Sequence, residues 1–293
     1  MNAKLALSVL SSLKLSIDSI RLLRRIGRAS LNAQDWLGLF LRFTPALLEN
    51  TLACGAPPET LGEWFSQAVS HFRFGAIFKL TGRDRTNLAD REVLRLAAEF
   101  DAPRLLEVGV SDGSSALGLL RQRDRFAQVV LTDRHNVFFR KRTPLGTLFY
   151  DSDRNLKLLK MLCFSFDLTP LGLQGPPELA RIETANPVLR TEFAIPAIQR
   201  FDLFRDALTP PFQIIKCANL LNCSYFTDDE LRRGVANIAR SLCEGGSLVV
   251  SQNNERYRDG EAVFVLRKRG AELDRVLSIN DHDAARLFPA RQA

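Results

Sequence analysis

The sequence lacks the features that mark several specialised classes of protein. No apolar run approaches the roughly 20 residues of a membrane-spanning helix, and Lys14, Asp18 and Arg21 interrupt the apolar start, which argues against a secretory signal. The five cysteines are scattered and form no CxxC pair or Cys/His cluster, so neither a disulfide framework nor a metal site is expected. A reducing, cytoplasmic setting is therefore predicted. An arginine- and serine-rich start leaves a mitochondrial transit peptide open as an alternative.

The 293 residues have the composition of an ordinary globular protein. They are 46% hydrophobic and 25% charged, which suffices to bury a core without disulfides. The formal charge of +7 is unevenly placed, because residues 1–33 hold six basic residues against Asp18 alone. The rest of the chain is nearly neutral. This distribution argues against a general nucleic-acid-binding function, which needs a basic footprint on the folded domain.

The amino-terminal third of the chain has helical periodicity. Apolar residues recur at nearly helical spacing over residues 4–26, and further helices are predicted over 35–50 and 60–74. We therefore expect a helical region over residues 1–85. Two interpretations of residues 4–26 stay open: a helix packed on the main domain, or a basic amphipathic helix that makes peripheral membrane contact.

From residue 86 onward, short apolar strands alternate with helices. This alternation predicts an α/β fold over residues 86–293, with a doubly wound, mostly parallel seven-stranded sheet of the Rossmann-like kind. Two last strands without a helix between them predict an antiparallel terminal hairpin. Residues 137–180 interrupt the pattern, and this insertion either forms a flap on the site or packs against the amino-terminal helices. The predicted strands cover 104–108, 128–132, 198–201, 212–217, 246–251, 262–267 and 275–279, and the predicted helices cover 87–100, 114–121 and 228–242.

The turn that follows the first of these strands has the pattern ExGxxxG, formed by Glu107, Gly109 and Gly113. Glycines allow a tight turn and a close approach of the backbone to a ligand, and open parallel sheets bind ligands at the carboxyl ends of their strands. The pattern differs from the GxGxxG of dinucleotide sites, and no lysine follows the second glycine as in a P-loop. A carboxylate before the first glycine would repel a pyrophosphate but favours an ammonium group. S-adenosylmethionine has an amino group and a sulfonium cation but no phosphate.

Two further acids follow successive strands. Asp133 ends the second strand, where a carboxylate can accept hydrogen bonds from both hydroxyls of a ribose. Asp202 follows the third strand, where it could accept from an adenine amino group. Either acid alone is as readily a helix cap or a turn residue. Three acids at successive strand ends favour a ligand site.

On these residues the chain resembles the class I S-adenosylmethionine-dependent methyltransferases over residues 85–280. The run Pro211 to Phe226 is similar to the fourth motif of that family, particularly in the CheR-type protein-glutamate methyltransferases, and Gly245-Gly246 to its glycine turn. The resemblance implies S-adenosylmethionine as cofactor, a reversed last strand, and a specific set of cofactor-binding residues. That set is Glu107, Gly109, Val110, Ser111, Gly113, Asp133, Arg134, Asp202, Leu203, Cys217, Ala218 and Asn219.

Methyl transfer requires an aligned nucleophile and the exclusion of water. The candidate catalytic residues are Asn219, Asn222 and Tyr225 after the fourth strand. Asn253, Glu255 and Tyr257 after the fifth strand are next, and His135 could reach the site, although a solvent-facing histidine is the alternative. The aromatic residues of the insertion favour an O or N acceptor atom on a small, partly apolar molecule. Protein carboxyl methylation and a non-catalytic S-adenosylmethionine-binding module remain alternatives. The aromatic residues in question are Phe138, Phe139, Phe149, Tyr150, Phe164 and Phe166.

Overall fold

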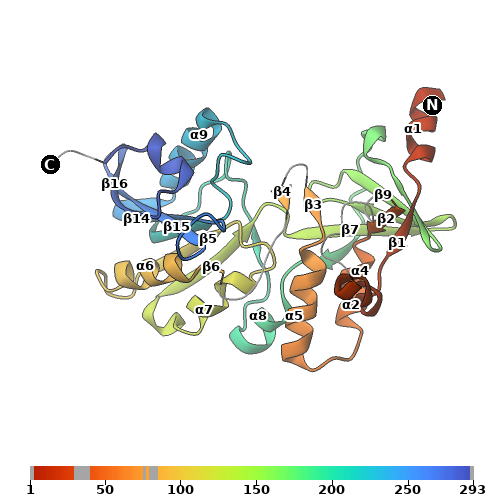
Figure 1. The fold of residues 1–293 in the computed structure, drawn as a ribbon, viewed down its shortest axis with the longest axis horizontal. Coiled ribbons are helices and arrows are strands. Elements are labelled where there is room, and N and C mark those ends of the chain that lie inside the picture. Colours follow the sequence, from red (N-terminus) through yellow and green to blue (C-terminus); the bar gives the residue numbers. More distant parts are fainter. Residues whose placement is uncertain (1–2, 30–39, 75–76, 79–84, 291–293) are drawn as a thin grey trace. The chain divides into compact units, whose positions relative to one another are not determined.

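The computed structural model describes residues 3–29, 40–74, 77–78 and 85–290, and the chain divides into two compact units. Unit 1 consists of Met1–Arg73, Phe78–Leu80 and His135–Val188. Unit 2 consists of Phe74–Ile77, Thr81–Arg134 and Leu189–Ala293. Each unit contains a seven-stranded sheet (Figure 1). A short pair, β3 (Arg73–Phe74) and β4 (Ile77–Phe78), forms a third sheet.

Unit 2 is built on a mostly parallel sheet with the strand order β12-β6-β5-β13-β14-β15-β16. The first five strands pair in parallel, as the α/β prediction expects. The chain first builds outward from β5 through β6 to β12 and then continues on the other side of β5 with β13, so the order reverses between β5 and β13. Such a switch point is where open α/β sheets bind ligands. The strands are β5 (Arg104–Val108), β6 (Gln128–Asp133), β12 (Gln199–Arg200), β13 (Phe212–Ala218), β14 (Leu242–Asn253), β15 (Glu261–Arg269) and β16 (Glu272–Ile279).

One expectation about this sheet is wrong in detail. The resemblance implies a reversed last strand, but the strand that runs against the others is β15, which pairs antiparallel with both β14 and β16. The last strand, β16, therefore runs in the main direction of the sheet. The edge strand β12 has only two residues, both exposed, and the chain between β6 and β12 passes through unit 1 and then through α8.

Helices cover both faces of the sheet of unit 2. Successive strand residues point to opposite faces, and the core divides accordingly. Leu105 and Ile214 pack with residues of α6 and α7, whereas Leu106 and Ile215 pack with residues of α9. The unit is therefore doubly wound, as predicted. Its helices are α6 (Asn87–Ala97), η2 (Ser114–Ala116), α7 (Leu117–Leu120), η3 (Arg123–Arg125), α9 (Asp228–Ala239) and η5 (Asp283–Leu287), and α8 (Pro187–Phe193) continues from unit 1 into unit 2.

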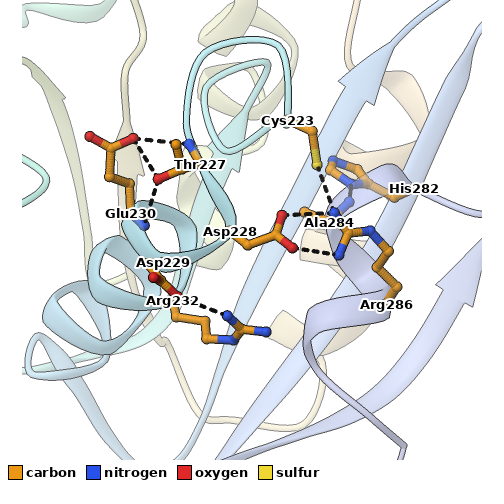
Figure 2. Close-up of polar contacts among 9 residues, drawn as sticks. All are labelled: Cys223, Thr227, Asp228, Asp229, Glu230, Arg232, His282, Ala284 and Arg286. Atoms are coloured by element: carbon orange, nitrogen blue, oxygen red, sulfur yellow. Dashed lines mark hydrogen bonds and ion pairs between the residues drawn. The ribbon is translucent and has the colours of Figure 1, made fainter.

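The start of α9 is fixed by local capping and by one ion pair. The Thr227 N–H donates to Glu230 Oε2 at 2.9 Å, and the Glu230 N–H donates back to Thr227 Oγ1, which is a capping box. Arg286 Nη1 and Nη2 donate to both carboxylate oxygens of Asp228 at 2.8 and 2.7 Å (Figure 2). This bidentate pair connects the first turn of α9 to the carboxy-terminal η5.

Unit 1 contains a mostly antiparallel sheet with the order β11-β7-β8-β9-β10-β1-β2. Four of its strands lie within the insertion and β11 begins at the last residue of it. β10 pairs antiparallel with β1 from the amino-terminal region. β2 adds to β1 in parallel. The insertion and the amino-terminal region thus share one sheet. The elements are α1 (Ala3–Ser11), β1 (Lys14–Ile17), α2 (Ile20–Ala29), β2 (Leu41–Phe43), α4 (Ala46–Leu52), α5 (Pro58–Val69), β7 (Val137–Thr143), β8 (Gly146–Tyr150), β9 (Leu156–Met161), β10 (Phe164–Asp167), η4 (Thr169–Leu171) and β11 (Ala180–Glu183).

The prediction of a helical region over residues 1–85 is wrong in part, because the described residues of this region contain the strands β1 and β2 beside the helices. The expected helix over residues 4–26 is broken by β1, in which Leu15 and Ile17, with Leu13 just before the strand, follow the two-residue period of a strand. Of the helix expected over 35–50, residues 35–39 lie outside the described residues, 41–43 form β2, and a helix begins only at Ala46, after Pro45. The helix expected over 60–74 ends at Val69.

Within the described ranges of the chain, no helix combines the length and the apolar character that crossing a bilayer requires.

Candidate functional site

The turn after β5 is folded back against the end of β6. The N–H groups of Gly109 and Val110 both donate to the Thr132 carbonyl oxygen, at 2.8 and 3.1 Å. Gly109, Ser111 and Gly113 have left-handed φ angles of 77°, 59° and 83°. For a serine this conformation costs about 1 kcal/mol or more. Part of that cost is offset, because the Ser111 N–H donates to the buried carboxylate of Asp133 at 2.8 Å. Asp133 therefore shapes the turn that the sequence assigned to a ligand.

Two leucine side chains pack onto the glycines of this turn. A Cβ atom on Gly109 would lie 2.9 Å from Leu220 Cδ2, and a Cβ atom on Gly113 would lie 2.6 Å from Leu189 Cδ1. Both contacts are shorter than carbon atoms tolerate, but the leucine ends can shift, so the left-handed φ angle is what favours glycine at each position. The sequence predicted that a ligand approaches these glycines. In the structure the ends of two flexible side chains approach them.

Glu107, the acid before the glycines, is paired with a lysine of the protein. Lys216 on β13 is its direct neighbour across the switch point, and Lys216 Nζ lies 3.1 Å from Glu107 Oε2 and 2.5 Å from Asp90 Oδ1 on α6. Only 1% of the Lys216 side chain and 3% of the Glu107 side chain are exposed. The ammonium group that meets this carboxylate in the structure belongs to Lys216, whereas the sequence assigned the carboxylate to the amino group of a cofactor.

The three charges of this cluster, Glu107, Lys216 and Asp90, form a buried unit with one negative charge in excess. Burial alone would lower the pKa of Lys216, but the adjacent Glu107 and Asp90 carboxylates outweigh it and raise that pKa above its ordinary value. Burial, with the Asp90 charge beside it, raises the pKa of Glu107, and Lys216 opposes that shift. The second oxygen, Glu107 Oε1, is buried without a hydrogen-bond partner among the described residues.

The third predicted acid, Asp202, is engaged in its own turn. Its Oδ1 accepts from the Phe204 N–H at 2.9 Å, and its Oδ2 lies 3.5 Å from Arg134 Nε. Arg134 directly follows Asp133, so this pair joins the ends of the second and third strands in chain order. Leu203 points into the core between the sheet and α9, which leaves it no face toward a ligand.

The candidates after β13 and β14 mostly bind one another. Asn219 Nδ2 donates to Asn253 Oδ1 at 2.7 Å, and Asn219 Oδ1 accepts from the Asn253 N–H at 2.8 Å. Asn253 Nδ2 in turn donates to the Arg85 carbonyl oxygen at 2.6 Å. Both polar groups of Asn219 are thus used to join two strand ends, with its backbone held at φ 58°. This arrangement favours a structural role for Asn219.

The remaining candidates differ in how they are held. Asn222 is buried and accepts from the Ser224 N–H, and Tyr225 is half-buried with its ring edge-on to Phe226. Cys217 lies in the core, and burial raises the pKa of its thiol to about 12, so it is no nucleophile. Ala218 is half-buried beside it.

Three further predicted residues divide between the units. Glu255 is exposed, whereas Tyr257 is buried and accepts a hydrogen bond from Arg256 at 2.7 Å. His135 belongs to unit 1, while the acids and the glycine turn belong to unit 2.

The aromatic residues of the insertion do not form a common apolar surface. Phe138, Phe149 and Tyr150 are buried in unit 1, and Phe138 packs on Phe72 with ring centroids 5.1 Å apart. These rings build the core of that unit. They therefore do not support the apolar acceptor molecule that the sequence suggested.

A cavity of about 720 Å³ opens in unit 2 beside the first turns of α6 and α7. Its lining combines charged or polar residues, including Arg85, Asp90 and Glu261, with the apolar Leu88 and Leu94. The start of α6 forms one wall, and there Glu261 accepts from the Leu88 and Ala89 N–H groups at 2.8 and 3.3 Å. The glycine turn is not among the residues that line this cavity in the described part of the chain.

Sequence reasoning missed Lys216, Asp90 and Glu261. A signal for the first was present, because Lys216 interrupts an otherwise apolar strand and a buried lysine requires a counter-charge. Glu261 was harder to find, since it caps a helix that lies more than 160 residues earlier in the chain.

Comparisons with known proteins give similar solved structures at low sequence identity. No protein-family model and no curated protein matches the sequence. Similar solved structures include the amino pentose methyltransferase CalS10 from Micromonospora echinaspora, at 17% identity over 64% of this chain and 66% of that chain, just under two thirds, with a TM-score of 0.33. A second is an S-adenosylmethionine-dependent methyltransferase from Clostridium acetobutylicum, at 12% identity over 68% and 74%, with a TM-score of 0.35. A third is the sugar N-methyltransferase KedS8 from Streptoalloteichus, at 14% over 70% and 73%, with a TM-score of 0.33. Likenesses of this size carry no argument about the activity, which has to rest on the residues of the chain itself.

Proposed function

We propose that the chain binds S-adenosylmethionine at the turn from Gly109 to Gly113 and is a class I methyltransferase. One observation carries the proposal. At the switch point of a doubly wound sheet, a turn with three left-handed residues is held by the Asp133 carboxylate through Ser111. Backbone strain of this kind concentrates at ligand sites, and the switch point is where this class of sheet binds ligands.

The residues present fit such a cofactor in two respects. Glu107 Oε1 is a buried acceptor without a partner among the described residues, which suits an amino group. The excess negative charge of Glu107, Asp90 and Lys216 favours a cation in this low-dielectric part of the unit. The leucine ends over Gly109 and Gly113 have to rotate away for a ligand to contact the turn. The cofactor, when bound, supplies the activated methyl group.

The chain's own residues would then bind and orient. Asp133 would accept hydrogen bonds from ribose hydroxyls while it keeps its bond to Ser111, since a carboxylate offers about four lone-pair sites. Asp202, held by Arg134, would accept on the adenine side. Lys216 holds Glu107 in its ionised form, and Asn219 with Asn253 fixes the ends of β13 and β14.

For the acceptor we propose an O or N atom of a small, partly apolar molecule. The support is the cavity beside α6, whose volume of about 720 Å³ lies in the range of small-molecule sites and whose mostly polar lining includes the apolar Leu88 and Leu94. Asn222 and Tyr225 remain the candidate catalytic residues. The engaged side chain of Asn219 favours the second candidate function, a non-catalytic S-adenosylmethionine-binding module. Protein carboxyl methylation is the third outcome that the assay below separates.

Calorimetric titration with S-adenosylmethionine tests the binding step. Asp133→Ala removes the ribose acceptor, and we expect its affinity to fall at least tenfold, because hydrogen bonds to charged groups contribute roughly 1.5–3 kcal/mol each. Asp133→Asn keeps an acceptor for the Ser111 N–H and separates loss of the charge from loss of the turn. Asp229→Ala is the matched control, since that exposed side chain pairs only on the surface of α9. Unchanged affinity in Asp133→Ala would rule out the ribose assignment.

The acceptor is tested with isotopically labelled cofactor and cell extract. A labelled product of small mass supports the proposed acceptor class, and label on protein that is lost in alkali indicates carboxyl methylation. Tight binding without any labelled product indicates the non-catalytic module.

A further inference from the structure

Unit 1 exposes two leucines at the tips of neighbouring hairpins. Leu145 lies in the turn between β7 and β8, and Leu162 lies in the turn between β9 and β10, with 71% and 92% of their surfaces exposed. Because β8 and β9 pair antiparallel, with Thr147 opposite Lys160, both turns lie at the same end of the sheet. Extending that register by two residues brings Leu145 opposite Leu162. Two of the three most exposed large apolar side chains in the described residues, the third being Leu7, are therefore neighbours at one sheet end.

The backbone at Leu162 makes this exposure more costly. Leu162 is the first of two turn residues and has a φ angle of 52°. Hairpin turns place glycine, asparagine or aspartate at such positions, because a Cβ atom is strained there. A leucine at this position is unfavourable for the turn and buries almost nothing within its own unit. An apolar side chain retained against both costs indicates a role in contact with something outside the unit.

Apolar surface continues from the tips along one face of the sheet. Leu15 on β1 and Phe164 on β10 are direct partners in register, and both are exposed. Phe164 begins β10 directly after the Leu162-Cys163 turn.

Basic residues surround this apolar surface. Lys141 and Arg142 are exposed at the end of β7, directly before the Leu145 turn. Lys160 lies at the end of β9 and pairs with Asp18. The acids of the β8–β9 connection, Asp151 and Asp153, lie at the opposite end of the sheet. Arg154 and Lys157 balance these acids at the opposite end. Lys141, Arg142 and Lys160 outnumber Asp18 at the end that carries the leucines, which is therefore the more cationic end.

We propose that this end of unit 1, the hairpin-tip surface formed by Leu145, Leu162, Lys141, Arg142 and Lys160, docks on an anionic lipid surface. The leucines enter the interface while the basic side chains remain at the depth of the lipid headgroups, the combination that interfacial binding requires. The sequence had placed such a contact on a single helix over residues 4–26. Those residues form α1, β1 and the start of α2 instead of one helix, and we place the contact on the hairpin tips beside β10, the partner of β1.

Sedimentation of the full chain with vesicles tests this inference and needs no cofactor, so its outcome is independent of the proposed activity. We expect binding to vesicles of phosphatidylcholine with 30 mol% phosphatidylglycerol (about one anionic lipid in three) and little binding to phosphatidylcholine alone. Raising the salt should weaken binding, because it screens the charges. Lys141→Glu should weaken it about fivefold for each unit of charge changed.

Leu162→Gly is the decisive variant, because glycine relieves the turn. We expect vesicle binding to fall about tenfold while thermal stability is unchanged or higher. Leu173→Gly is the matched control: that leucine is 53% exposed in the same unit, beside the β8–β9 connection at the opposite end of the sheet. Equal binding to neutral and anionic vesicles, no binding at all, or wild-type binding by Leu162→Gly would overturn the inference. So would a wild-type dimer in solution that Leu162→Gly dissociates, since the partner would then be a second copy of the chain.

Discussion

Replacing Lys216 by methionine tests how the chain tolerates charge at its switch point. The substitution keeps the length and apolar stem of the side chain but leaves Glu107 buried without its counter-ion. At the observed 3.1 Å, the attraction between Lys216 and Glu107 is about 5 kcal/mol for an effective dielectric constant of 20. The net loss of stability is smaller than this attraction, because the substitution also removes the cost of desolvating the lysine. Removing one partner of a buried pair typically costs about 3–5 kcal/mol, and we expect that loss.

Urea unfolding of Lys216→Met at neutral pH, followed by circular dichroism, measures this cost. The double variant Glu107→Gln/Lys216→Met should recover about 2 kcal/mol of it, because the buried charge is then gone and Asp90 is partly solvated.

The stability of Lys216→Met should also depend on pH in a definite direction. Without Lys216, burial keeps the pKa of Glu107 raised, so protonation favours the folded state. The deficit of Lys216→Met relative to wild type should therefore shrink as pH falls from 8 toward 5. A loss below about 1 kcal/mol, or a double variant no more stable than Lys216→Met, would refute the reasoning.

Three further predictions concern other parts of unit 2. Burial lowers the pKa of His282 to about 4. The free energy of unfolding of the wild type should therefore fall by up to about 3 kcal/mol between pH 6.5 and 4, because the unfolded chain takes up a proton. His282→Asn can still accept from the Ala284 N–H, and its free energy of unfolding should fall less in urea titrations over that range. Glu261→Gln should lower the free energy of unfolding by about 1–2 kcal/mol, because the first turn of α6 loses its carboxylate cap; an unchanged midpoint at constant m-value would contradict this. Leu220→Ala should bind S-adenosylmethionine severalfold more tightly in calorimetry, because no side chain has to leave Gly109; weaker binding would mean that Leu220 supports the site.

The central strands were predictable because their signal is local. β5 and β13 are short apolar runs bounded by polar or turn residues, and both begin where the sequence predicts. α9 likewise shows its start in Thr227 and Glu230, a capping pattern three residues apart.

The amino-terminal region was mispredicted because its strands depend on distant partners. Lys14 pairs with Ser165, about 150 residues later in the chain, and no local pattern shows that such a partner exists. Leu13 and Ile17 fit a helix face, and together with Leu15 they fit a strand, so only the pairing with β10 decides between the two. The apolar runs of the insertion could likewise be recognised from the sequence. That its strands complete the amino-terminal sheet could not.

The candidate site could be located but not described from the sequence. Glycines and acids at strand ends identify the correct edge of the sheet, since that follows from strand direction. Which side chains bind one another depends on register. Lys216 meets Glu107, and Asn219 meets Asn253, because β13 aligns with β5 on one side and β14 on the other.

Hydrogen exchange of the peptide that spans Glu107 to Ser114 tests the central claim most directly. With S-adenosylmethionine at saturation, the account predicts slower exchange of the amides from Gly109 to Gly113 and of the segment around Asp133, with no change in α9. Saturating cofactor that leaves this turn unprotected, or that protects another part of unit 2 instead, would contradict it.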